Sequence, residues 1–193
     1  MTPGSTNYEL LQECRQGDGF RISHSLYLSL DLALELSDLY FRYIHVAFHD
    51  LFHQGSFREA VATGTLPKIL LLAIAGLSAR FSNDASFTAT PSRDRGRVFR
   101  KEAEKLINFH STSLTTIQAC ATVAAALVIE GEVSTESIFL NVACRMALIM
   151  DLPNAPANTR IEQELHLRGN QLANLNGGRR LTVAYSVVVS YCD

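Results

Sequence analysis

Residues 68–81 read Lys-Ile-Leu-Leu-Leu-Ala-Ile-Ala-Gly-Leu-Ser-Ala-Arg-Phe, and this stretch decides the fold class. Apolar side chains point in nearly every direction around a helix of this sequence. Such a helix is typical of the interior of a bundle, because a helix at the surface keeps one polar face. Pro67 comes directly before it, at a position where the missing N–H costs no helical hydrogen bond. The stretch predicts a buried helix surrounded by others.

The sequence before this helix predicts two more helices. From Leu26 onward, apolar residues recur at three- and four-residue steps, which places them on one face of a helix. That face consists of Leu32, Leu36, Leu39, Tyr40, Tyr43, Ile44 and Ala47. We expect Gly55 to interrupt this helix, and Phe57–Thr63 to form a short one that ends at Gly64.

The sequence after residue 81 predicts a loop over Ser82–Arg95 and then four helices. The residues expected to face inward are Phe99, Ala103, Leu106 and Ile107 in the first, Ala119–Ile129 in the second, and Ile138, Val142, Met146 and Ile149 in the third. The expected end signals are a capping box of Thr115 with Gln118, a stop at Gly131, a cap at Ser134, and a capping box of Thr159 with Glu162 that opens Arg160–Arg168. We therefore predict an all-α fold, an irregular helical bundle or array.

Composition limits the function classes. The chain has 193 residues, 47% of them hydrophobic and 19% charged, which suits one globular domain. The net charge of −2 and the absence of Trp disfavour non-specific binding of nucleic acid. The longest apolar runs fall short of the ~18–20 residues that a membrane span requires, so we expect no membrane partner. The four cysteines lie far apart without a C-x-x-C pair, which argues against a structural zinc site.

Three histidines are the one constellation that suggests catalysis. His45, His49 and His53 are spaced by four residues, and two histidines at that spacing on a helix can share a metal. The segment His49-Asp-Leu-Phe-His53 has Asp where the zinc motif H-E-x-x-H has Glu, and no third ligand follows it. The alternatives are therefore a metal-dependent helical enzyme that uses this face, or surface and helix-end histidines without a metal.

Other candidate groups have structural interpretations. The sequence contains no nucleophile elbow, P-loop or dinucleotide-binding motif, and Cys120 lies inside an apolar helical run. We expect Arg80 and Arg145 to reach a carboxylate or helix-end carbonyls. One basic cluster is mixed with acidic residues and is expected to be a solvated helix surface. It consists of Arg93, Arg95, Arg97, Arg100, Lys101 and Lys105.

Five short motifs in order resemble the fungal-specific transcription factor domain, the middle homology or regulatory region of zinc-cluster (Zn2Cys6) regulators, including xylanolytic activators. The first runs over Leu39–His45 with Phe48, His53 and Ser56-Phe57, and the second over Pro67, Leu70–Ile74 and Ala79–Ser82. The third, fourth and fifth are Leu114–Ala119, then Gly131 with Ala143–Ala147 and Leu152, and Ile161–Leu165. The resemblance spans about Leu26 to Arg168.

The sequence also departs from this family. The family often has glycine where this chain has Asn141 and Asp151, and prolines where it has Val46, His49 and Gly55. Residues 169–193 do not continue the resemblance, and Leu181–Tyr191 alternates like a strand. We therefore divide the chain into a flexible lead-in, 1–25, a partial regulatory domain, 26–168, and an atypical tail, 169–193. This division implies a truncated or mis-spliced gene model.

The resemblance implies a nuclear regulator of a metabolic or biosynthetic gene set. This chain contains no six-cysteine module, so direct DNA binding by it alone is not expected. We expect it to act through other regulators, the transcription machinery or a small-molecule effector, with no catalytic residues, metal ligands or cofactor. The alternatives are the metal-dependent enzyme at His45, His49 and His53, or a non-functional remnant.

Overall fold

The computed structural model describes residues 19–21, 27–45 and 51–152, and the fold is given for these ranges. Six α-helices and one two-stranded sheet make up most of the described chain. In chain order the elements are β1 (Gly19–Arg21), β2 (Tyr27–Ser29), α2 (Leu30–Tyr43), α4 (Gln54–Thr63), α5 (Lys68–Ser78), η1 (Ala79–Phe81), η2 (Ala85–Phe87), α6 (Arg97–Leu106), α7 (Leu114–Glu130) and α8 (Val133–Ile149). The prediction of an all-α helical array is confirmed.

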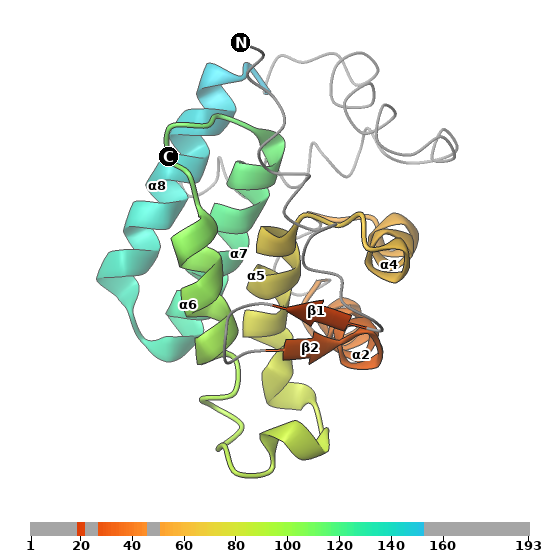
Figure 1. The fold of residues 1–193 in the computed structure, drawn as a ribbon. Coiled ribbons are helices and arrows are strands. Elements are labelled where there is room, and N and C mark those ends of the chain that lie inside the picture. Colours follow the sequence, from red (N-terminus) through yellow and green to blue (C-terminus); the bar gives the residue numbers. More distant parts are fainter. Residues whose placement is uncertain (1–18, 22–26, 46–50, 153–193) are drawn as a thin grey trace.

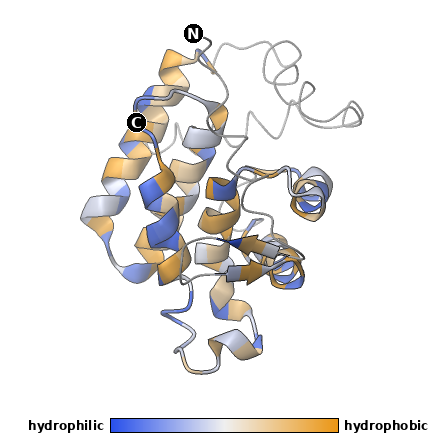
Figure 2. Cartoon of the chain, in the orientation of Figure 1, coloured by the Kyte–Doolittle hydropathy of each residue, from blue (hydrophilic) through white to orange (hydrophobic). Residues whose placement is uncertain are grey.

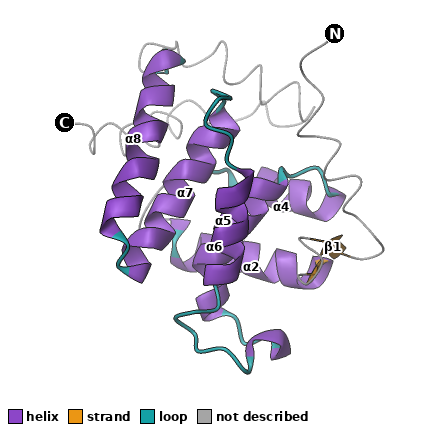
Figure 3. Cartoon of the chain, turned by 60° about the vertical axis from the view of Figure 1, so that its left-hand side comes forward, coloured by secondary structure: helices purple, strands orange, loops and turns teal. Residues whose placement is uncertain are grey.

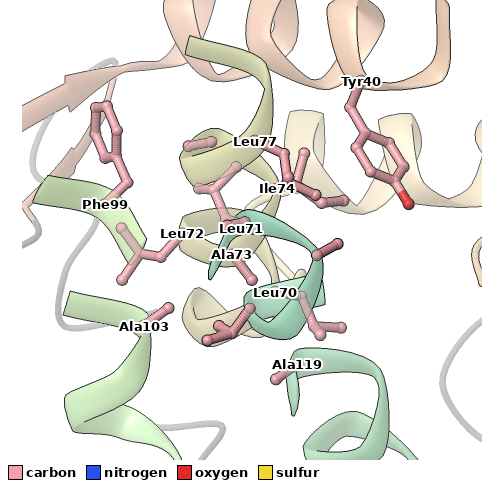
Figure 4. Packing of buried hydrophobic residues seen from close by; sticks show 14 of the residues in the cluster. Tyr40, Leu70, Leu71, Leu72, Ala73, Ile74, Leu77, Phe99, Ala103 and Ala119 are labelled. Atoms are coloured by element: carbon pink, nitrogen blue, oxygen red, sulfur yellow. The ribbon is translucent and has the colours of Figure 1, made fainter. Parts of the chain in front are cut away.

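Helix α5 lies at the centre of this array (Figure 1). It packs against α2 on one side and against α6 and α7 on the other. Every residue from Leu70 to Ser78 is buried, which confirms the all-round apolar pattern. Figure 4 shows Leu72 beside Phe99 and Ala103, while Tyr40 approaches from the other side. Pro67 is the cap before the first helical residue, so its missing N–H costs no helical bond.

The first half of the described chain builds one side of the array. Strands β1 and β2 pair antiparallel, and this small hairpin buries Phe20 and Leu28 against α2. Residues Gly19–Arg21 fall within the stretch assigned to the lead-in, yet Phe20 belongs to the hydrophobic core. Helix α2 ends at Tyr43, before Gly55, which lies instead in the first turn of α4. The expectation that Gly55 interrupts the first helix was therefore wrong.

The second half builds the other side. Helices α7 and α8 lie side by side in both views, and α6 crosses near α5 (Figures 1 and 3). The expected stop of α7 at Gly131 is confirmed, since this glycine has φ 83°. The side chain that caps α7 is Ser113, which accepts from the N–H of Thr116, rather than the expected Thr115. The cap of α8 is Glu132 without a side-chain bond, so the expected cap at Ser134 was wrong.

Helix α8 packs with a different face from the one predicted. Its buried residues are Glu136, Phe139, Ala143, Cys144, Met146 and Ala147. Ile138 and Ile149, expected to face inward, are 59% and 64% exposed, and only Met146 of the predicted stripe is buried. Apolar residues occur on both faces of this helix, so periodicity alone selected the wrong one. The predicted helix Arg160–Arg168 and strand Leu181–Tyr191 lie outside the described residues.

Candidate functional site

The three histidines do not share one helix. His45 follows the end of α2 at Tyr43, whereas His53 is the residue directly before α4. His49 lies outside the described residues. The ring of His45 is buried against the rings of Tyr40 and Phe41. His53 is the cap of α4, where its Nδ1 accepts from the N–H of Ser56 at 3.3 Å. Over residues 19–21, 27–45 and 51–152 no group of three His, Cys, Asp or Glu side chains could hold a metal.

The described cysteines have little thiol reactivity to offer. Cys120 is buried in α7, and desolvation raises the pKa of its thiol to about 12. A thiol with so high a pKa carries almost no thiolate near pH 7, and the thiolate is the nucleophile. Cys144 on α8 is disulfide-bonded. Neither residue fits the role of a nucleophile.

The most organised polar site joins α6 to the end of α7. Arg100 donates through Nε and Nη2 to the two carboxylate oxygens of Glu130, both at 2.9 Å. Their side chains are only 7% and 4% exposed. Arg100 also pairs with Glu104, one turn along α6, and Arg97 reaches Glu130 at 3.3 Å. We call Arg97, Arg100, Glu104 and Glu130 the α6–α7 ion cluster.

The electrostatics of this cluster follow from burial and pairing. Burial disfavours the charge of Arg100, but its hydrogen bonds and the charges of Glu130 and Glu104 outweigh that effect and raise its pKa. For Arg80 burial dominates and lowers the pKa, although the charge of Glu130 acts in the opposite direction. The Nε of Arg80 donates to the carbonyl of Leu77 at 3.2 Å, which confirms the expected helix-end contact. Arg145 is exposed on α8.

The basic cluster is partly used inside the protein. Arg100 was expected on the solvated face of its helix and is instead buried with Glu130. Arg95 donates to the carbonyls of Ser82 and Thr90 and so holds the 82–95 loop together. Arg97 contacts Asp94 and Glu130. Half of the six basic residues, Arg95, Arg97 and Arg100, are therefore engaged in contacts with other parts of the protein.

Two glycines that the sequence prediction did not single out bring α5 and α6 together. A Cβ atom on Gly96 would overlap the backbone carbonyl of Gly76. A Cβ atom on Gly76 would lie 3.2 Å from the Cβ of Arg100. The helices therefore meet backbone to backbone, next to the ion cluster. Gly76 is the one glycine inside the apolar run of α5. A single glycine in a buried helix could have indicated a close approach of another backbone.

Several apolar side chains are exposed in the described chain, and two groups of them lie close together. Tyr43 and Phe81 stack with ring centroids 4.9 Å apart, and the guanidinium of Arg42 lies 5.2 Å from the Tyr43 ring. The second group is the outer face of α8, which we define as Ile138, Arg145, Leu148 and Ile149. Both groups are suited to contact another protein segment.

Within the described ranges, no single helix is long and apolar enough to cross a bilayer. The pair Gln54–Thr63 and Lys68–Phe81 meets the length and composition limits only when taken together, and it is bent by 115°. Most of Lys68–Phe81 is buried in the protein core.

Two curated proteins of Schizosaccharomyces pombe, both named uncharacterized transcriptional regulatory proteins, are similar to this chain. One is 29% identical over 92 residues, which covers 47% of this chain and 9% of the relative. The other is 33% identical over 94 residues, which covers 46% of this chain and 11% of the relative. The chain thus matches about a tenth of the length of either relative. No family model and no solved structure matches it. The similarity indicates a relationship to fungal transcriptional regulators.

Proposed function

We propose that this chain is part of the regulatory region of a fungal transcription factor of the zinc-cluster type. It works in the nucleus through contacts with other regulators, the transcription machinery or a small effector, and it catalyses no reaction. The observation that carries the proposal is the similarity of nearly half the chain to two proteins named as transcriptional regulators.

The arrangement of the described residues supports this proposal. Of the segments that resemble the regulatory domain, Leu39–His45 runs from α2 past its end, and three lie within packed helices: Leu70–Ile74 in α5, Leu114–Ala119 in α7 and Ala143–Ala147 in α8. Their shared role is to form one helical core. The polar clusters described above join helices, and a scaffold of this kind is suited to present surfaces for binding.

Direct DNA binding is not part of the proposed role of this chain. The net charge is −2, and Arg97 and Arg100 of the basic cluster are paired with acidic side chains. Proteins that bind phosphate backbones need several lysine and arginine side chains open to solvent. A DNA-binding module would have to come from another part of the protein or from a partner.

A fusion experiment tests the regulatory role. The 193-residue chain is joined to an unrelated DNA-binding domain in yeast, and the transcript of a reporter with the matching binding sites is measured. We expect a change relative to the DNA-binding domain alone. Glu130→Ala, which breaks the α6–α7 ion cluster, should abolish this change, whereas Asp38→Ala, at an exposed pair with Arg58, should preserve it. An unchanged reporter level at equal expression would contradict the proposal.

The nuclear location has its own test. A fluorescent tag placed on the protein at its own locus should give signal that coincides with a DNA stain. Exclusion of the tagged protein from the nucleus would argue against a regulator of transcription, whatever the result of the fusion experiment.

A further inference from the structure

The loop over residues 82–95 contains a threonine, Thr90, that is open to another protein. The loop contains η2, leads from η1 to α6, and protrudes from one end of the helical array, at the bottom of Figures 1 and 3. Figure 2 shows it mostly in pale and blue colours, as expected for a segment in contact with solvent. Thr90 is partly exposed. The fully exposed residues beside it are Thr88, Ala89, Pro91, Ser92 and Arg93.

Most hydroxyl groups of this loop already make local hydrogen bonds. Ser82 donates to a carboxylate of α2 at 2.8 Å. Ser86 and Thr88 donate to other groups of the loop, at 2.6 Å and 2.8 Å. Among the residues that the structure describes, no group is hydrogen-bonded to the hydroxyl of Thr90 or of Ser92. These two hydroxyls can react without the loss of an existing bond.

The sequence around Thr90 has the pattern Thr-Pro-x-Arg, because Pro91 follows Thr90 and Arg93 is the third residue after it. Pro91 has no backbone N–H, and proline-directed protein kinases select this position with a site that offers no partner for such a group. A basic residue three positions after the acceptor matches the charge pattern by which kinases of this class choose substrates. Thr2 is the other Ser or Thr directly before a proline, and it has Ser5 at the third position instead of a basic residue.

We propose that Thr90 is a phosphorylation site of a proline-directed protein kinase. In this reaction Oγ1 of Thr90 forms a bond to the γ-phosphorus of ATP that the kinase holds with Mg²⁺, the bond from that phosphorus to the bridging oxygen breaks, and ADP leaves. The hydroxyl proton passes to the aspartate of the kinase catalytic loop. Ser92 is followed by Arg93 rather than by proline, so it is not the acceptor. The inference does not depend on the proposed function.

The structure also places a cation beside the position of the new phosphate. Arg95 donates through Nε to the carbonyl of Thr90 at 3.0 Å and through Nη1 to a second loop carbonyl at 2.6 Å. Over the described part of the chain, neither Arg93 nor Arg95 forms an ion pair, and Asp94 between them pairs with Arg97 at 3.2 Å. A phosphothreonine has a charge of about −1.5 to −2 at pH 7 and forms strong hydrogen bonds with guanidinium groups. We expect Arg95 to hold the phosphate against the loop.

Phosphorylation of the full 193-residue chain by a purified cyclin-dependent kinase, with ATP and Mg²⁺, tests the site. Intact mass should show one phosphate per chain, and peptide mass spectrometry should place it on Thr90. Thr90→Val, which keeps the shape of the side chain without the hydroxyl, should abolish the modification, whereas Thr2→Val should leave it unchanged. Arg93→Ala should lower the initial rate about five- to tenfold, and Arg93→Lys, which keeps the charge, should recover most of it.

The contact with Arg95 has a separate measurement. The phosphorus NMR signal of the modified protein follows the second ionisation of the phosphothreonine. A guanidinium beside the phosphate favours its doubly charged form and lowers the pKa of that ionisation. We expect a lower pKa in the protein than in a phosphorylated peptide of residues 86–93, which lacks Arg95. Arg95→Gln should raise the pKa toward the peptide value, and Lys101→Gln, at an exposed position on α6, should not.

Defined outcomes would overturn the inference. An intact chain that stays unmodified, while a peptide of residues 86–97 is phosphorylated, would mean that the fold shields Thr90 from the kinase. A phosphate that persists in Thr90→Val would place the acceptor elsewhere, and an unchanged rate in Arg93→Ala would remove Arg93 from recognition. The same phosphate pKa in the protein, the peptide and Arg95→Gln would show that Arg95 does not hold the phosphate.

Discussion

Helices α5 and α8 are both rich in apolar residues, but their surroundings differ. Helix α5 has neighbours on several sides, α2, α6 and α7, and all of its residues from Leu70 to Ser78 are buried. Helix α8 packs mainly against α7 and leaves its outer face exposed. The apolar content of a helix thus indicates how much surface it has to bury, while the number of neighbouring elements decides how much of it is buried within the described chain.

This difference predicts where substitutions are costly. The region around α5 is held by long-range contacts: the α6–α7 ion cluster and, next to it, the close approach of Gly76 and Gly96. The end of α8 is held by local backbone bonds. Substitutions that break the long-range contacts around α5 should lower the free energy of unfolding more than substitutions at the end of α8.

The largest effect is expected for Glu130→Ala. The substitution leaves the buried guanidinium of Arg100 without the carboxylate that it meets through two hydrogen bonds. Removing one partner of a buried pair typically costs about 3–5 kcal/mol, and because Glu104 stays paired with Arg100 we expect a loss at the lower end of this range. Chemical denaturation followed by circular dichroism should show a loss of this size in the free energy of unfolding.

The control for Glu130→Ala is an ion pair at the surface. Asp38 and Arg58 form a pair whose side chains are about half exposed. Because solvent screens such pairs, Asp38→Ala should cost no more than about 1 kcal/mol. Equal losses in the two variants would mean that burial does not add to the contribution of the α6–α7 ion cluster to stability.

The sequence correctly predicted that α5 and α7 are buried, because both helices are apolar on nearly every side. An all-round apolar helix is buried whichever way it is turned, so its orientation need not be known. For α8 the orientation matters, since Ile138 and Ile149 lie on one side and Phe139 and Ala143 on another. A period of 3.6 residues fits both stripes, and only the position of α7 decides between them.

The polar sites were harder to predict for a related reason. Arg100 and Glu130 are 30 positions apart, so no local pattern connects them. Within α7, however, Glu130 is the only charged residue, and a lone acidic residue at the end of an apolar helix is a usable signal. The resemblance to a regulatory domain, by contrast, was based on short motifs, and those in the described residues lie largely in packed helices, so they are informative about family without revealing a ligand.

An intermediate effect is expected for Gly96→Ala. The backbone at this residue has φ −75°, which any residue can adopt, so the cost arises from space alone. The added methyl would overlap the carbonyl of Gly76 and push α6 away from α5. Overpacking of this kind typically costs about 1–3 kcal/mol, and thermal unfolding should show the corresponding fall in Tm.

Gly55→Ala separates this steric effect from the general consequence of replacing glycine. Gly55 lies in the first turn of α4, and an added Cβ would meet only the His53 side chain, at 3.3 Å. Its effect should stay within about 1 kcal/mol of the parent protein. If Gly96→Ala were equally mild, the backbone contact between α5 and α6 would not be the tight one described above.

The smallest effect is expected at the end of α8, and it should be stabilising. Three helices of the described chain are followed by a residue in the left-handed region: Gly64 at φ 72° directly after α4, Gly131 at φ 83° directly after α7, and Asp151 at φ 52° two residues after the end of α8. Only the third is not glycine, and it is one of the positions where the resembled family often has glycine. A residue other than glycine has a steric cost at such a φ, and this cost is smaller for aspartate than for most residues.

Asp151→Gly should therefore raise the free energy of unfolding by about 0.5–1 kcal/mol, because the Schellman motif, in which the N–H of residue 151 donates to Leu148 and that of Leu152 to Ala147, keeps both hydrogen bonds and loses the strain. Gly131→Ala is the mirrored control: it introduces strain at φ 83° without any steric contact within 4 Å, and should cost a similar amount. Differential scanning calorimetry should show a higher Tm for Asp151→Gly and a lower Tm for Gly131→Ala than for the parent protein. A destabilised Asp151→Gly variant would indicate that contacts of the aspartate side chain outweigh the strain, and the end of α8 would then be held by more than its backbone.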